Sequence, residues 1–153
     1  AVPVVVLYIW LAFDSDPGRM IILAALEAVF YFYAAGSLIA YMLEDEFASL
    51  DELFAAGATF TLLAWAFAYV YVVCQALLPG SFAAYAASNN PRTWMELLFL
   101  SFTTLSGVGL GDIVPLLPMA RALVMIEEFS GVMYLALVVS RLIALSVTTR
   151  PPR

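Results

Sequence analysis

The residues that could do chemistry in this sequence form a glycine-rich run at positions 106–112. Its members are Ser106, Gly107, Val108, Gly109, Leu110, Gly111 and Asp112. Glycine at every second position lets the backbone alternate between ordinary and positive φ angles. Such alternation can turn successive carbonyl oxygens to one side, where rings of oxygens replace the hydration shell of a cation. One chain supplies only one wall around an ion, so the run predicts a cation filter in a symmetric oligomer.

A short helix is expected to present this run. Thr93 and Glu96 have the spacing of a capping box, with Thr93 as the N-cap. The expected helix, residues 94–104, would be roughly 16 Å long, about half of a hydrocarbon core ~30 Å thick. Non-helical backbone at that depth is tolerated only where it is buried in protein or lines a wet cavity. The negative end of the helix dipole would favour cations there.

The composition places these elements in a membrane. Hydrophobic residues make up 65% of the 153 and charged residues 12%, against about 25% charged in soluble domains. The apolar stretches are residues 1–13, 20–43, 53–78 and 119–147. The first is shorter than the ~20 residues of a span. It lacks the basic start and cleavage site of a signal peptide. Because the chain does not begin with Met, we expect sequence to precede it.

These stretches predict an all-α membrane protein. Residues 53–149 hold two of the long stretches, with the expected short helix and the glycine-rich run between them. Residues 1–52 would supply one or two extra transmembrane helices and an acidic connector at 44–52. The segment 79–118 is interrupted by glycine before it could make a full crossing, and we expect the function there.

The charged residues exclude several classes of function. The chain has no Lys and no His, and its net charge is −6. A nucleic-acid interface needs a basic stripe, and a Walker-type loop needs a lysine. Ser-His-Asp catalysis and the usual zinc sites lose their histidine. Cys74 is the one cysteine and cannot form an intrachain disulfide. We therefore expect neither an enzyme nor an organic cofactor.

Two acids lie inside the fourth stretch, where charge is expensive and usually functional. Glu127, Gly131 and Tyr134 share one helix face by their spacing. Glu127 could attract cations near an inner cavity or brace the pore helix through a hydrogen bond to Thr103 or Thr104; we favour bracing. For Glu128 the sequence favours no role.

Residues 104–112 resemble the potassium-channel signature Thr-x-x-Thr-Val-Gly-Tyr-Gly-Asp. The segment 113–115 and Arg121 follow at spacings similar to those of small bacterial potassium channels of the two-helix pore type. The resemblance covers about residues 53–145, and its filter part is the specific one. It implies that residues 53–149 form a pore module of outer helix, pore helix, selectivity filter and inner helix, assembled as a homotetramer. Potassium ions would be held by the backbone carbonyls of Val108, Gly109 and Leu110. It also implies that Gly131 is a gating hinge; the alternative is a glycine that lets helices pack closely.

Two positions depart from the family pattern. Gly107 replaces the threonine whose hydroxyl forms the innermost ion site, and Leu110 replaces the tyrosine that braces the filter. A weakly selective sodium and potassium channel is therefore one alternative, and Gly107→Thr is expected to sharpen selectivity. A non-conducting membrane subunit is the other.

The resemblance also sets the expected topology. With the filter opening outward, Asp112 would form a carboxylate ring at the outer mouth or hold the filter by a hydrogen bond. The tail with Arg150 and Arg153 would then face the cytoplasm, in agreement with the positive-inside rule. We expect a multi-pass protein in contact with lipid in a cell membrane, the bacterial inner membrane.

Overall fold

The computed structural model describes residues 17–44, 50–84 and 90–148. Three long helices dominate this part of the chain: α2 (Pro17–Glu44), α3 (Leu50–Leu77) and α5 (Pro118–Thr148). Each contains a segment long and apolar enough to cross a membrane, namely Gly18–Leu43, Leu53–Leu77 and Pro118–Arg141. The expected all-α membrane fold is confirmed, with α2 as a membrane-length helix ahead of the other two. The stretch 1–13 and residues 45–49 of the acidic connector lie outside the described residues.

The helix boundaries follow from proline and glycine. Pro17 opens α2 and Pro118 opens α5. Proline suits the first turn of a helix because its missing N–H would have no partner there. α3 ends at Leu77, ahead of Pro79 and of Gly80, whose φ is 82°. These proline and glycine residues set where the long helices begin and end.

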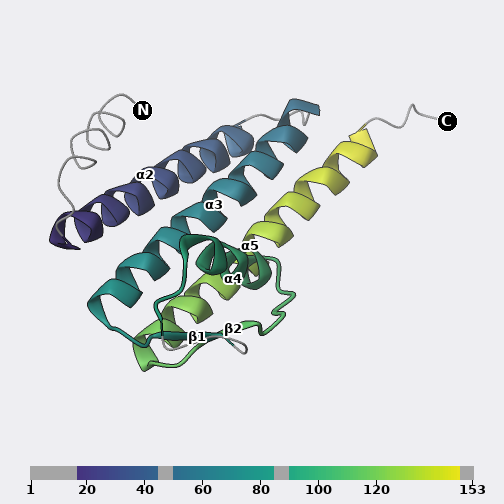
Figure 1. Cartoon of the computed structure of the whole chain (residues 1–153). Coiled ribbons are helices and arrows are strands. Elements are labelled where there is room, and N and C mark those ends of the chain that lie inside the picture. The colour runs from purple at the N-terminus through teal and green to yellow at the C-terminus, as the bar shows by residue number, and fades with distance from the viewer. Residues whose placement is uncertain (1–16, 45–49, 85–89, 149–153) are drawn as a thin grey trace.

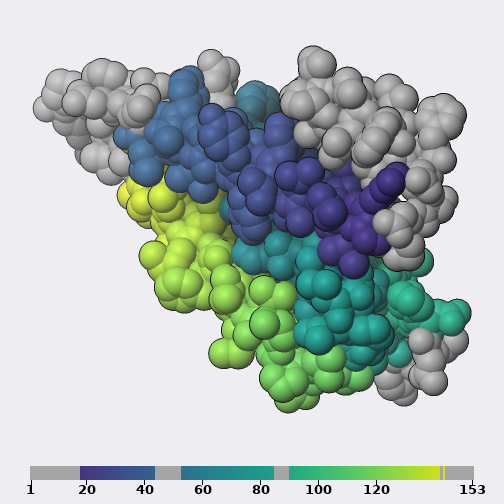
Figure 2. Space-filling view, turned by 90° about the vertical axis from the view of Figure 1, so that its left-hand side faces the viewer, coloured from purple at the N-terminus to yellow at the C-terminus, as the bar shows by residue number. Residues whose placement is uncertain are grey.

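The long helices lie side by side and alternate in direction (Figure 1). α2 packs along α3, and Figure 2 shows α2 lying across the upper part of one face of the molecule, with α5 visible below it. The short helix α4 (Trp94–Leu105) contacts both α3 and α5. It lies toward the end of the molecule where α3 finishes and α5 begins (Figure 1). α3 is therefore the central helix.

Two short strands, which the sequence did not predict, close this end of the molecule. β1 (Phe82–Ala84) pairs antiparallel with β2 (Ile113–Pro115), with Phe82 opposite Pro115 and Ala84 opposite Ile113. The amide of Leu116 also donates to the Ser81 carbonyl oxygen at 2.8 Å. The pairing joins the chain that leaves α3 to the chain that follows the glycine-rich run.

The buried core lies where α3, α4 and α5 meet. Its members are mostly apolar and come from all three helices: Leu63, Ala64, Phe67, Tyr71, Leu97, Leu100, Leu105 and Tyr134. α4 is buried along one side although it is only 12 residues long. Packing on both neighbours fixes the position from which the glycine-rich run departs.

Candidate functional site

The N-terminus of α4 has the predicted capping box. The Glu96 amide donates to Thr93 Oγ1 at 3.3 Å, and the Thr93 amide donates to Glu96 Oε2 at 2.6 Å. The backbone N–H of Thr93 lowers the pKa of the Glu96 carboxyl, and the Thr93 hydroxyl and Arg92 lower it further. Arg92 lies 3.5 Å from Glu96. The start of α4 is thus fixed by both backbone and charge.

The glycine-rich run begins where α4 ends, and its first amides fold back onto the helix. The Gly107 amide donates to the Thr104 carbonyl oxygen at 2.9 Å. The amides of Val108 and Gly109 both donate to the Thr103 carbonyl oxygen at 3.0 Å. The backbone carbonyls of Thr103 and Thr104 therefore hold the start of the run against the end of α4.

The glycines of the run adopt the alternation that the sequence indicated. The φ angles are 72° at Gly107, 56° at Gly109 and 71° at Gly111, and no non-glycine residue in the described part of the chain has a positive φ. Every second residue is therefore in the left-handed region, which glycine occupies without strain. Asp112 follows, exposed, immediately before β2.

Glu127 lies at the centre of a buried polar contact between three helices. Its side chain is fully buried. The hydroxyl of Tyr71, from α3, donates to Glu127 Oε2, and the hydroxyl of Ser101, from α4, contacts Glu127 Oε1. Glu127 thus joins α5 to α3 and to the short helix α4.

The expected partners of Glu127 were wrong. The Thr103 hydroxyl donates within α4, to the Leu100 carbonyl oxygen at 2.9 Å, and no hydrogen bond joins either threonine to Glu127 in the described residues. Thr103 is two residues beyond Ser101, and two residues turn a helix by roughly 200°. The face that carries Ser101 toward Glu127 therefore points Thr103 elsewhere.

The number of hydrogens available around Ser101 indicates whether Glu127 is protonated. Ser101 Oγ lies 2.8 Å from the Ala64 carbonyl oxygen and also contacts Glu127. A serine hydroxyl has one hydrogen to donate. All groups are satisfied when Tyr71 donates to a neutral Glu127, Glu127 donates to Ser101, and Ser101 donates to Ala64. A neutral acid also suits a site where, among the described residues, no cation forms an ion pair with it.

Gly131 lies where α5 crosses the end of α4. A Cβ atom at this position would stand 2.1 Å from the Leu105 carbonyl oxygen. Any side chain would therefore push the two helices apart. This close backbone contact is the packing role that competed with the hinge, while α5 continues as a helix through the position.

The shared helix face expected in α5 is confirmed. Glu127, Gly131 and Tyr134 are all buried, and the Tyr134 hydroxyl donates to the Ala56 carbonyl oxygen at 2.6 Å. Glu128 is on another face and is exposed. It borders a hollow of about 190 Å³ together with Thr104 and the glycines of the run.

A family model described as an ion channel matches residues 20–147, most of the chain. The chain belongs to this ion channel family. No curated protein and no solved structure matched the chain.

In this ion channel the matched region begins within α2 and runs through α5, so it includes all three membrane-length helices. The three membrane-length helices make it a multi-pass membrane protein. It is a transport protein and not an enzyme.

Sequence reasoning missed several residues that position the ion channel's site. Tyr71 and Ser101 hold Glu127, and Gln75 holds the loop before α4. Tyr71 is one of many aromatic residues in its stretch, and nothing in its spacing distinguishes it. Ser101 could have been suspected from the sequence, because it is a polar residue within a mostly apolar helix.

Proposed function

We propose that this ion channel is a homotetramer that conducts potassium passively through a filter of backbone carbonyls. Val108, Gly109 and Leu110 supply the carbonyl ligands, and potassium ions occupy the filter. The channel resides in a cell membrane, the bacterial inner membrane. The observation that carries the proposal is the alternation of positive φ along residues 107–111, at the end of a half-span helix.

Exposure of large apolar side chains supports the oligomer. Val108 and Leu110 are 62% and 63% exposed on a single chain. On α5, Met125 and Phe129 are 67% and 68% exposed. Apolar surface beside the filter fits contact with neighbouring subunits, because contiguous exposed apolar patches mark interaction sites. Four copies around one axis would bring four runs together.

Further residues receive roles in this proposal. The exposed Asp112 would form the acidic ring at the outer mouth. Glu127 would hold the pore helix through Ser101, while Thr103 and Thr104 would hold the run through their carbonyls. A hinge at Gly131 would require the inner half of α5 to move about its contact with Leu105.

Ion flux in liposomes tests the proposal. The purified protein is reconstituted, and potassium and sodium gradients are compared. Gly109→Ala forces a side chain into a left-handed position and is expected to abolish the flux. Gly57→Ala is the matched control, because a Cβ there meets nothing within 4 Å and no positive φ is involved. Flux unchanged in Gly109→Ala would refute the filter, and flux lost equally in both variants would refute a specific role for Gly109.

A weakly selective cation channel is the second candidate function, and Gly107 favours it. The position has no side-chain oxygen, and its φ of 72° is strained for any other residue. This changes the expectation for Gly107→Thr: a β-branched residue there should reduce flux before it sharpens selectivity. A potassium-to-sodium flux ratio near one in the wild type would establish the weakly selective channel. No flux from folded protein would favour a non-conducting subunit.

A further inference from the structure

A large cavity lies away from the glycine-rich run, between α2 and the end of α3. Its volume is about 790 Å³, within the ~300–1,000 Å³ typical of small-molecule sites. The first turns of α2 and the last turns of α3 form two of its walls, and the segments around β1 and before α4 complete it.

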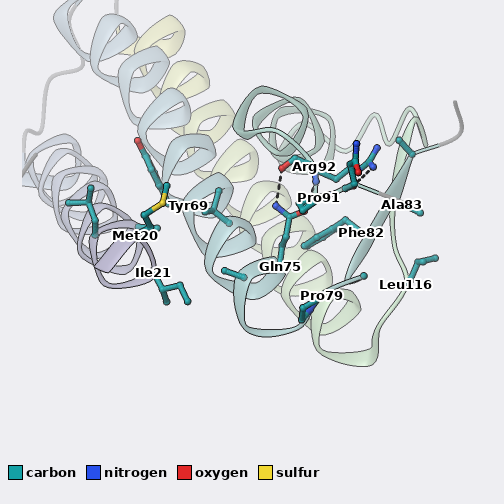
Figure 3. A pocket seen from close by; sticks show the side chains of 17 residues that line it. Met20, Ile21, Tyr69, Gln75, Pro79, Phe82, Ala83, Pro91, Arg92 and Leu116 are labelled. Carbon is teal, nitrogen blue, oxygen red and sulfur yellow. Dashed lines mark hydrogen bonds between the residues drawn. The ribbon is translucent and has the colours of Figure 1, made fainter. Parts of the chain in front are cut away.

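The two sides of this cavity differ in polarity. Figure 3 shows Met20 and Ile21 on one side, Gln75 toward the middle and Arg92 on the opposite side. Most of the lining is apolar, and among the lining residues, all in the described part of the chain, Arg92 has the one charged side chain. The cavity therefore suits an amphiphile whose charged end is negative.

Arg92 belongs to a built polar site. Its side chain is nine-tenths buried, and its guanidinium donates to the Asn90 carbonyl oxygen and faces Glu96. Its backbone is fixed by Gln75: the Arg92 amide donates to Gln75 Oε1 at 2.6 Å, and Gln75 Nε2 donates to the Arg92 carbonyl oxygen at 2.9 Å. The guanidinium is thus held in place before any ligand arrives.

The position of the cavity indicates where a ligand would come from. α2 and α3 are membrane-length helices, and the cavity lies at the end of both. The ends of spans lie at the level of lipid headgroups. A lipid could then place its phosphate near Arg92 and an acyl chain along Met20 and the neighbouring wall of α3. Arginine is well suited to binding phosphate.

We propose that this cavity binds an anionic phospholipid, with its phosphate at Arg92 and one acyl chain between α2 and α3. The site gives α2 a role beyond spanning the membrane, because α2 forms the apolar wall. It also places the lipid phosphate one residue before Thr93, the N-cap of α4. The proposal concerns binding and does not depend on conduction.

Lipid retention on the detergent-solubilised protein tests the proposal by native mass spectrometry. The probes are phosphatidylglycerol and phosphatidylcholine with the same acyl chains. We expect phosphatidylglycerol to bind roughly tenfold more tightly, because it brings a net negative charge to Arg92. Phosphatidylcholine carries an ammonium group that compensates its phosphate. Equal retention of the two lipids would overturn the role of Arg92.

Two variants and a matched control locate the site. Ala76→Phe fills the cavity from an exposed wall position without changing the contacts of Arg92. Arg92→Gln removes the charge. Ala58→Phe makes the same change on the same helix outside the cavity. We expect both cavity variants to lose the preference for phosphatidylglycerol and the control to keep it.

Other outcomes would overturn the proposal. Retention in Ala76→Phe equal to that in Ala58→Phe would show that the lipid binds elsewhere, and this comparison stands even if Arg92→Gln does not fold. Inorganic phosphate at millimolar concentration should not displace the lipid, because it cannot use the apolar wall. Displacement by phosphate would instead assign a simple anion site.

Discussion

Removing the carboxyl group of Glu127 tests the buried contact that joins α3, α4 and α5. Glu127→Ala leaves the Tyr71 hydroxyl buried without an acceptor and opens a cavity between the helices. An unsatisfied buried hydroxyl costs about 1–3 kcal/mol, and large-to-small core substitutions cost about 2–5 kcal/mol. Since the two contributions overlap, we expect the free energy of unfolding to fall by about 3–5 kcal/mol.

Glu127→Gln separates a neutral acid from an ionised one. The glutamine carbonyl can accept from Tyr71, and its amide can donate to Ser101, which keeps its donation to Ala64. If Glu127 is neutral in the wild type, the variant repeats every hydrogen bond. We therefore expect a loss below about 1 kcal/mol.

The assay is unfolding of the detergent-solubilised protein by SDS, with liposome flux measured on the same samples. Glu128→Ala and Glu128→Gln are the matched controls, because Glu128 is the adjacent carboxylate and is exposed. An infrared spectrum should also show the carbonyl stretch of a protonated carboxylic acid that Glu127→Gln removes. A loss in Glu127→Gln as large as that in Glu127→Ala would refute the neutral acid and indicate an ionised carboxylate.

Three further predictions follow from other contacts. Gly131→Ala should lower the free energy of unfolding by about 1–3 kcal/mol through overpacking, because its Cβ would meet the Leu105 carbonyl oxygen at 2.1 Å. Thermal unfolding measured beside the Gly57→Ala control checks this prediction. Equal stability of the two variants would refute the close contact. The hydrogen bonds at the start of α4 hold the pKa of Glu96 below its unfolded value. The stability that ionised Glu96 contributes is therefore fully present above about pH 4.3 and is lost as pH falls through the lower folded pKa. Glu96→Gln should make the free energy of unfolding depend less on pH in this range, and an unchanged pH profile would contradict this. Asp112→Asn should reduce potassium flux at low salt and much less at high salt, where screening removes the effect; identical flux at low salt would exclude an acidic ring at the mouth.

Local chemistry made much of the fold predictable from the sequence. The capping box placed the start of α4 at Trp94, as observed, and the expected end near Thr104 differs by one residue from Leu105. The apolar stretches 20–43, 53–78 and 119–147 match α2, α3 and α5 within three residues at each end. The alternating glycines indicated their own positive φ angles. Each of these features depends on residues close together in the chain.

What could not be predicted depends on how helices rotate against one another. The partners of Glu127 come from positions 56 and 26 residues away, Tyr71 and Ser101, and a turn of α4 by two residues would have exchanged Ser101 for Thr103. The strands β1 and β2 are three residues each, too short to leave a periodic pattern. The cavity beside Arg92 needs α2 and α3 to be in place before it exists.

The contact at Gly131 has a geometric consequence for the glycine-rich run. α5 meets α4 through main-chain atoms, at Leu105, two residues before Gly107. Rotamer changes cannot alter a separation that no side chain occupies. The backbone contact between Gly131 and Leu105 therefore fixes the position at which the run begins. In a tetramer, four copies of this contact would place the four runs at the same level. The symmetric arrangement of the four runs would then depend on the missing Cβ atom of Gly131.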